Sequence, residues 1–194
     1  AMTRRLAATA ITPNQISQLG MGAAVLAGLS LWGAGHAQGV GRVLLLLLGA
    51  AMVQVRLLCN LLDGMVAIEA GRQSPDGGFW NEFPDRISDA LILMGLALGV
   101  AYPALGWAAV SMAFLTAYIR ELGVNCGVGA DFSGPMAKPQ RMALVTGAAV
   151  LTVFAPLWGG RDELLIAGLW VIVAGAAITT LRRGWRILGK LNGR

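Results

Sequence analysis

Residues 43–67 form a long apolar run, VLLLLLGAAMVQVRLLCNLLDGMVA, which has no polar side chain before Gln54. A helix needs about 20 such residues to cross the hydrocarbon of a bilayer. A helix is required because the bilayer core has no water to bind unpaired backbone groups. No break signal separates this run from Asn60, Asp63 and Ala67, so we expect the helix to project a turn or two beyond the bilayer.

The composition of the whole chain indicates a membrane protein. Of its 194 residues, 56% are hydrophobic and 13% are charged, whereas soluble domains carry roughly 25% charged residues. We predict one all-α integral membrane domain, residues 1–194, with six transmembrane helices. These helices are expected near residues 14–34, 40–60, 87–102, 103–122, 141–158 and 163–181. Glycine pairs at a spacing of four are interpreted as sites of close helix packing, namely Gly95 with Gly99 and Gly123 with Gly127.

The distribution of basic residues predicts the orientation. Six spans place both termini on the side that holds most lysines and arginines, and leave Arg42 and Arg161 on the other. The positive-inside rule therefore predicts that the termini and the segments 68–86 and 123–140 are cytoplasmic, in a bacterial cytoplasmic membrane. No cleavable signal peptide is expected, because a polar stretch follows the N-terminal arginines. An interfacial helix that binds anionic headgroups is expected for Arg182, Arg183, Arg186, Lys190 and Arg194.

Cysteine content and charge exclude several classes of protein. The chain has two cysteines, Cys59 and Cys126, and no Cys/His pair has the spacing of zinc ligands, which excludes a disulfide framework and a zinc site. The net charge of +5 would suit a nucleic-acid partner. However, the basic residues flank apolar segments, so membrane lipids or a phosphorylated substrate are the expected partners, and nucleic acid is not.

Polar side chains recur at helical spacing in two neighbouring segments. Positions 60, 63, 64 and 67 share one helix face, and so do positions 82, 85 and 89. Two adjacent helices could therefore bring several carboxylate and amide oxygens to one cavity, where a hard cation such as Mg²⁺ or Mn²⁺ would bind. The alternative is that these residues are solvated at helix ends. Three carboxylates at such spacing favour a functional site at the membrane surface.

These residues resemble the motif of the CDP-alcohol phosphotransferase family. The family carries DxxDGxxAR, a spacer, and then GxxxDxxxD; this chain reads NxxDGxxAI, a spacer, and then NxxxDxxxD. Segments 12–17 and 134–141 also agree with the family. The departures are Asn60, Ile68 and Asn81, in place of Asp, Arg and Gly. Glu82 could restore the charge that is lost at position 60.

The resemblance implies a phospholipid-synthesising enzyme. Members of the family bind two divalent ions, which clamp the diphosphate of a CDP-linked lipid while an alcohol attacks the phosphorus nearer the lipid, so that CMP leaves. By position, Asp63 and Asp85 would be metal ligands, Asn60 a weakened ligand, and Asp89 a ligand or the catalytic base. The residues expected to lie against the nucleotide are Gly64, Ala67 and Asn81. Relatives are commonly homodimers, which implies the same here.

The acceptor site is expected where basic residues gather at the cytoplasmic ends of the fourth and fifth spans. Arg120, Lys138 and Arg141 would hold a phosphate on a small alcohol acceptor, although the positive-inside rule alone also predicts basic residues there. Arg56, one turn before Asn60, is interpreted as snorkelling to the interface, with contact to a phosphate as the alternative.

Two other functions are considered. The substitutions at positions 60 and 68 would fit a catalytically weakened relative that binds nucleotide or lipid. A transporter is disfavoured, because the ionisable cluster lies at one membrane face, whereas transport sites usually lie near the midplane.

Overall fold

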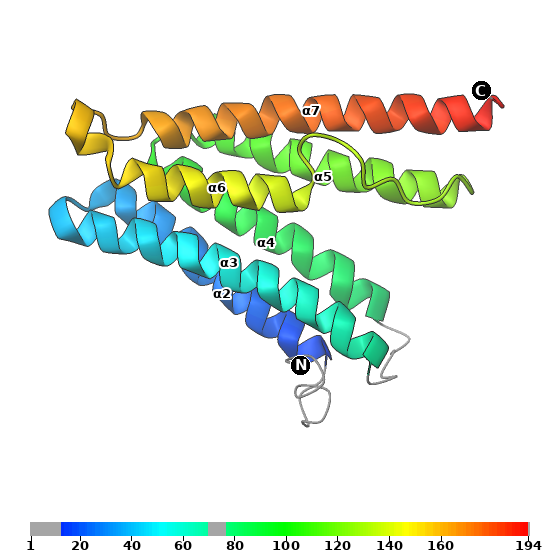
Figure 1. Cartoon of the computed structure of the whole chain (residues 1–194), viewed down its shortest axis with the longest axis horizontal. Coiled ribbons are helices and arrows are strands. Elements are labelled where there is room, and N and C mark those ends of the chain that lie inside the picture. Colours follow the sequence, from blue (N-terminus) through cyan, green and yellow to red (C-terminus); the bar gives the residue numbers. More distant parts are fainter. Residues whose placement is uncertain (1–12, 70–76, 194) are drawn as a thin grey trace.

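A bundle of long helices forms the protein (Figure 1). The computed structural model describes residues 13–69 and 77–193, and within these ranges it contains helices and no strand. In chain order the helices are α2 (Pro13–His36), α3 (Gly39–Glu69), α4 (Gly77–Gly99), α5 (Pro103–Asn125), α6 (Lys138–Thr152), the 3₁₀ helix η1 (Ala155–Trp158) and α7 (Glu163–Leu191). The predicted all-α fold is therefore confirmed.

Successive α-helices run in opposite directions, so the connections gather at two ends of the bundle (Figure 1). The short connections after α2, α4 and α6 lie at one end. Residue 13, the segment 126–137 and the C-terminus of α7 lie at the other. Helix α2 packs against α3 and α4, and α7 packs against α5 and α6. Helix α3 also contacts α6, and α4 also contacts α5. This arrangement brings the second halves of α3 and α5 and the first halves of α4 and α6 to one end.

Within residues 13–69 and 77–193, three helices are long and apolar enough to cross a membrane by length and composition: Asn14–His36, Gly39–Met65 and Glu163–Leu191. The other three predicted spans stay predictions. The helix bounds differ from those of the predicted spans, because helix ends follow backbone hydrogen bonding and not side-chain hydropathy alone. Helix α4 already begins at Gly77 and includes Pro84, α6 ends at Thr152, and α7 continues to Leu191.

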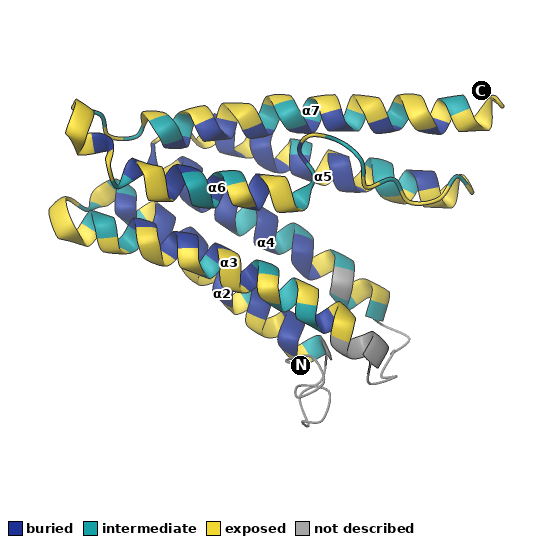
Figure 2. Cartoon of the chain, viewed as in Figure 1, coloured by how far each residue is buried: buried dark blue, intermediate teal, exposed yellow. Residues whose placement is uncertain are grey.

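Exposed residues occur along all the helices of the bundle (Figure 2), and many of them are large and apolar. Leu157 is 83% exposed and Trp185 is 74% exposed, while small and aliphatic residues such as Ala97 and Leu169 fill the space between the helices. Exposed apolar surface costs about 25 cal/mol per Å² in water. Hydrocarbon removes this cost, so an outer surface of this kind fits an integral membrane protein.

Glycines allow α2 and α4 to touch along their backbones. A Cβ at Gly95 would lie 2.2 Å from the carbonyl oxygen of Gly28, and one at Gly35 would lie 1.9 Å from that of Gly99. Side chains cannot fit at such distances, so the predicted close packing at Gly95 and Gly99 is confirmed. This contact fixes the height of α4, and therefore the height of its carboxylates, relative to α2.

The second glycine pair does not pack as predicted. Gly123 lies against Ile187 of α7. Gly127, by contrast, has a φ of +72° and no neighbour within 4 Å of a built Cβ, so it serves the turn after α5.

Arginines fasten both ends of the bundle. At the end with the short connections, Arg42 pairs with Asp162 at 2.6 Å, and Arg161 donates to the carbonyl oxygen of Gly35 at 2.7 Å. These two arginines thus share one end, as the six-span pattern predicts.

Arg183 lies inside the bundle near the opposite end. It donates to the carbonyl oxygens of Ser133 and Thr116 at 2.9 and 2.7 Å. The predicted interfacial position of Arg183 is wrong, because its guanidinium satisfies backbone carbonyls of the segment 126–137 and of α5.

Candidate active site

A small cavity lies between α2, α3 and α4, near the end of the bundle where α2 begins and α7 ends. Asn60 and Asp63 line it from α3, Asp85 lines it from α4, and Ser17 and Arg56 complete its polar wall. Its volume is about 10 Å³, roughly the room of one water molecule. The predicted convergence of positions 60, 63 and 85 is therefore found, in a space suited to a small ion and too small for a nucleotide.

Neutral donors hold the Asp63 carboxylate. Ser17 donates its hydroxyl to Oδ2 at 2.6 Å, and the backbone N–H of Gly64 donates to Oδ1 at 2.7 Å. Asp63 is buried, so the hydrogen bonds offset part of the cost of removing its charge from water. They also fix the direction of its oxygens beside the cavity.

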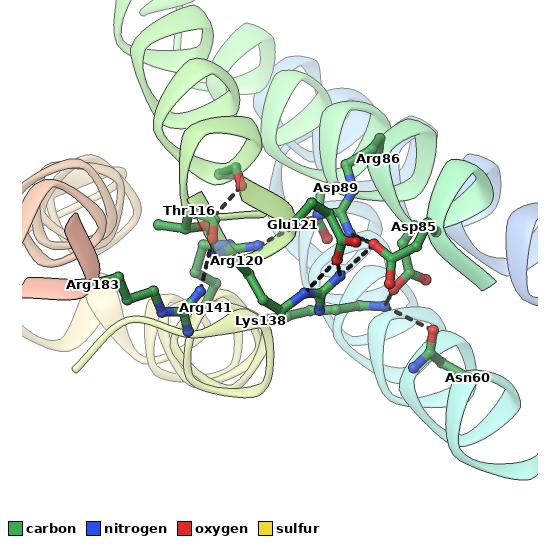
Figure 3. A network of polar contacts seen from close by, with 12 residues as sticks. Asn60, Asp85, Arg86, Asp89, Thr116, Arg120, Glu121, Lys138, Arg141 and Arg183 are labelled. Carbon is green, nitrogen blue, oxygen red and sulfur yellow. Dashed lines mark hydrogen bonds and ion pairs between the residues drawn. The ribbon is translucent and has the colours of Figure 1, made fainter. Parts of the chain in front are cut away.

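Two cations share the Asp85 carboxylate, and Figure 3 shows one of them, Lys138, beside it. Arg56 binds Oδ1 and Lys138 binds Oδ2. Lys138 also donates to Oδ1 of Asn60 at 2.8 Å, which ties the start of α6 to α3 and α4. Burial, together with the nearby charge of Arg56, lowers the pKa of the Lys138 ammonium to about 8, although Asp85 and Asp89 act in the opposite direction.

Asp89 and Arg141 form a pair that is fully enclosed by protein (Figure 3). Their side chains are 0% and 2% exposed, and Nη2 of Arg141 lies 2.7 Å from Oδ2 of Asp89. Arg141 also donates to Thr116 Oγ1 and to the carbonyl oxygen of Met136, both at 3.2 Å. The other oxygen, Oδ1 of Asp89, has no hydrogen-bond partner among the described residues.

Glu82 lies apart from this cavity. It pairs with Arg86 at 2.7 Å and with Arg120 at 2.5 Å, and it lines a separate hollow between α4 and α5. Arg120 also pairs with Glu121 at 2.8 Å. Glu82 therefore does not supply the cavity with the charge that Asn60 lacks.

The donor set fits a divalent cation, although no metal cluster is preformed. Among residues 13–69 and 77–193, no three His, Cys, Asp or Glu side chains are close enough to hold a metal ion. Positive side chains already face both oxygens of Asp85, and one buried oxygen of Asp89 has no hydrogen-bond partner in the described part of the chain. Carboxylate and amide oxygens are the ligands that Mg²⁺ and Mn²⁺ prefer. A cation could therefore take the place that Arg56 and Lys138 hold at Asp85.

The predicted nucleotide-binding residues are described only in part. A Cβ built at Gly64 meets no atom of the described residues within 4 Å, so these residues leave space for a ligand beside this backbone. The side chains of Ala67 and Asn81, and that of Ile68, lie outside the described residues.

Sequence reasoning missed two partners of the carboxylates. Arg56 is 3% exposed and paired with Asp85, so the snorkelling interpretation is wrong. Ser17 binds Asp63 from α2. For Arg56 the signal was present, because it stands four residues before Asn60 and seven before Asp63 and so shares their helix face.

The known proteins that are similar to this chain have related names. No family model matches the chain. The phosphatidylinositol phosphate synthase of Mycobacterium tuberculosis is 28% identical over 191 residues, which cover 94% of this chain and 82% of that protein. The enzyme of the same name from Mycobacteroides abscessus is 26% identical over 182 residues, covering 89% and 75%. The archaetidylinositol phosphate synthase of Aeropyrum pernix is 29% identical over 141 residues, covering 72% and 69%.

Solved structures share the fold. Crystal structures of the M. tuberculosis phosphatidylinositol phosphate synthase superpose with a TM-score of 0.77 with CDP-DAG bound and 0.78 in complex with manganese and citrate. Each is 24% identical to this chain and covers 96% of it; the chain covers 91% and 87% of them, respectively.

Proposed function

We propose that this chain, a member of the CDP-alcohol phosphotransferase family, is an enzyme of phospholipid biosynthesis that transfers a phosphatidyl group from a CDP-linked lipid to an alcohol and releases CMP. One observation carries the proposal. The motif residues Asn60, Asp63 and Asp85, from two different helices, line one cavity at the end of the bundle. The relatives that it matches over most of their length are named phosphatidylinositol phosphate synthases.

The metal-binding side chains are proposed to be Asn60, Asp63, Asp85 and Asp89. A divalent ion, Mg²⁺ or Mn²⁺, would supply charge neutralisation on the donor diphosphate, and two ions are expected from the family resemblance. A manganese complex of a homologue supports a divalent metal. Asp89, with one oxygen unpartnered among the described residues, would be a ligand or would accept the proton of the attacking hydroxyl.

The cytidine of the donor is proposed to lie outside the small cavity, against the backbone at Gly64 and beside Ala67 and Asn81, with its diphosphate directed toward the cavity. The open space next to Gly64 supports this position. A homologue binds CDP-DAG, which supports a CDP-linked lipid as the donor.

A phosphorylated alcohol is the proposed acceptor, with Arg120 and Lys138 as the cations nearest to it. Relatives named phosphatidylinositol phosphate synthase support an acceptor of this class. Arg141 is proposed to act indirectly, because it is buried and engaged with Asp89.

We also propose six membrane spans, cytoplasmic termini, a cytoplasmic active site in a bacterial cytoplasmic membrane, and a homodimer. The antiparallel order of helices α2 to α7 supports the topology. The positive-inside rule supports the orientation.

Release of CMP from CDP-diacylglycerol by the purified protein, with Mg²⁺ or Mn²⁺ and a panel of free and phosphorylated alcohols, tests the function. Asp63→Asn should abolish turnover while the protein stays folded, because it removes a charge at the cavity without changing the size of the side chain. Asp162→Asn makes the same change at the opposite end of the bundle and should leave turnover intact. Equal turnover in wild type and Asp63→Asn would refute the proposed site.

A catalytically weakened, ligand-binding relative is the second candidate. Asn60 in place of a carboxylate and the two cations on Asp85 favour it, since both reduce the negative charge available to a metal. Metal-dependent release of CMP with any acceptor would rule it out.

A further inference from the structure

Arg56 is a buried cation beside the candidate metal ligands. Its side chain is 3% exposed, and it lines the same cavity as Asn60, Asp63 and Asp85. A buried charge lowers stability unless other groups offset it. The position of Arg56 within an apolar helix therefore indicates a functional role.

Among the described residues, the carboxylate that pairs with Arg56 is shared with a second cation. Asp85 also binds Lys138, whose second partner, Asn60, is neutral. Asp63 accepts hydrogen bonds from two neutral donors, the Ser17 hydroxyl and the Gly64 N–H. The charges of Asp63, Asp85, Arg56 and Lys138 sum to zero. If Asp63 and Asp85 also hold a divalent cation, the cavity gains an excess of two positive charges, which an anion of about two negative charges would neutralise.

Arg56 has an N–H donor that could bind such an anion. A guanidinium has five N–H groups, and the Nε of Arg56 has no acceptor among the described residues. Guanidinium groups bind phosphate oxygens through two parallel hydrogen bonds. The arginine that the family motif places at position 68 is Ile68 in this chain, so this motif segment supplies no cation of its own there.

We infer that Arg56 is a substrate-binding residue that donates to the diphosphate of the CDP-linked donor; this inference rests on the proposed function. With a metal bound, Asp85 would hold the ion in place of the guanidinium, and the N–H groups of Arg56 would be free to donate to the diphosphate. Arg56 thus replaces, from one turn before Asn60, a positive charge that the motif has lost.

The test compares Arg56→Gln with Arg42→Gln, which removes an arginine paired with an aspartate at the opposite end of the bundle. Dissociation constants for CDP are measured by calorimetry in detergent micelles containing Mn²⁺, and those for Mn²⁺ alone by electron paramagnetic resonance. Arg56→Gln should weaken CDP binding roughly 10- to 100-fold, the range for a lost hydrogen bond to a charged group. It should leave Mn²⁺ binding unchanged or tighter, because a competing cation is gone. Arg42→Gln should change neither.

Lys138 still offsets Asp85 in Arg56→Gln, so the variant should fold. Arg56→Lys provides a second variant, which keeps the charge and should weaken CDP binding less. CDP binding within twofold of wild type in folded Arg56→Gln would overturn the inference. So would loss of Mn²⁺ binding, which would show that Arg56 only positions Asp85. Wild-type protein that neither binds CDP nor releases CMP would overturn the proposed function itself.

Discussion

Removal of Arg141 should cost the protein much of its stability, because Asp89 would remain charged with no guanidinium beside it. Both side chains are enclosed, and Arg141→Met removes the ion pair at 2.7 Å and two hydrogen bonds at 3.2 Å. Loss of one partner of a buried pair costs about 3–5 kcal/mol. For a chain of this size, 1 kcal/mol corresponds to roughly 2–4 °C, so the expected fall in Tm is about 6–20 °C. Lys138 also interacts electrostatically with Asp89, so the fall in Tm is expected near the lower end of this range.

The assay is unfolding in detergent micelles without metal, arranged as a double-mutant cycle. The variant Arg141→Met with Asp89→Leu replaces the pair by apolar side chains and should be more stable than either single variant, since no buried charge is left alone. Arg141→Lys keeps the charge and should lose less stability than Arg141→Met. The reasoning from burial would be refuted if the losses of unfolding free energy in the two single variants simply added in the double variant. A loss below about 1 kcal/mol in Arg141→Met would refute it as well.

Three further predictions concern other parts of the molecule. Gly95→Val should lower the unfolding free energy by about 1–3 kcal/mol or more, because its Cβ would meet the carbonyl oxygen of Gly28 at 2.2 Å; Tm reports it. Gly64→Val should raise the KM for CDP-diacylglycerol at least tenfold, because the valine side chain would occupy the proposed position of the nucleotide. Its Tm should be nearly unchanged, because the side chain enters open space among the described residues. Burial alone would raise the pKa of Asp131, but hydrogen bonds from Ser133 and the charge of Arg186 lower it below its ordinary 3.8. Asp131 therefore stabilises the fold above about pH 4 and loses this effect as pH falls through its folded pKa; Asp131→Asn should flatten this dependence in acid unfolding.

Each of these predictions has a control or a contrary outcome. Gly147 has no neighbour within 4 Å of a built Cβ, so Gly147→Val should leave Tm almost unchanged, unlike Gly95→Val. Normal KM in Gly64→Val would place the nucleotide elsewhere. A stability curve in Asp131→Asn as steep as in wild type between pH 5 and pH 2 would assign the acid sensitivity to other carboxylates.

Much of the candidate site could be predicted, because helical spacing is a local property. The positions of Asn60 and Asp63 on one face of α3, and of Asp85 and Asp89 on one face of α4, follow from the rise and turn of a helix. The choice of partners could not be predicted. Arg56 meets Asp85 across 29 positions of sequence, Ser17 meets Asp63 across 46, and Arg141 meets Asp89 across 52.

The sequence by itself determined that the chain is helical and apolar outside, and that its oxygen-bearing side chains stand on two helix faces. Both properties depend on residues a few positions apart and on the absence of water in a bilayer. Only the tertiary structure decided which cation neutralises which carboxylate. It also decided that Arg56 and Arg183 turn inward and that Glu82 lies outside the cavity. The glycine contact between α2 and α4 sets these heights and distances, and a spacing along one helix contains no information about the helix beside it.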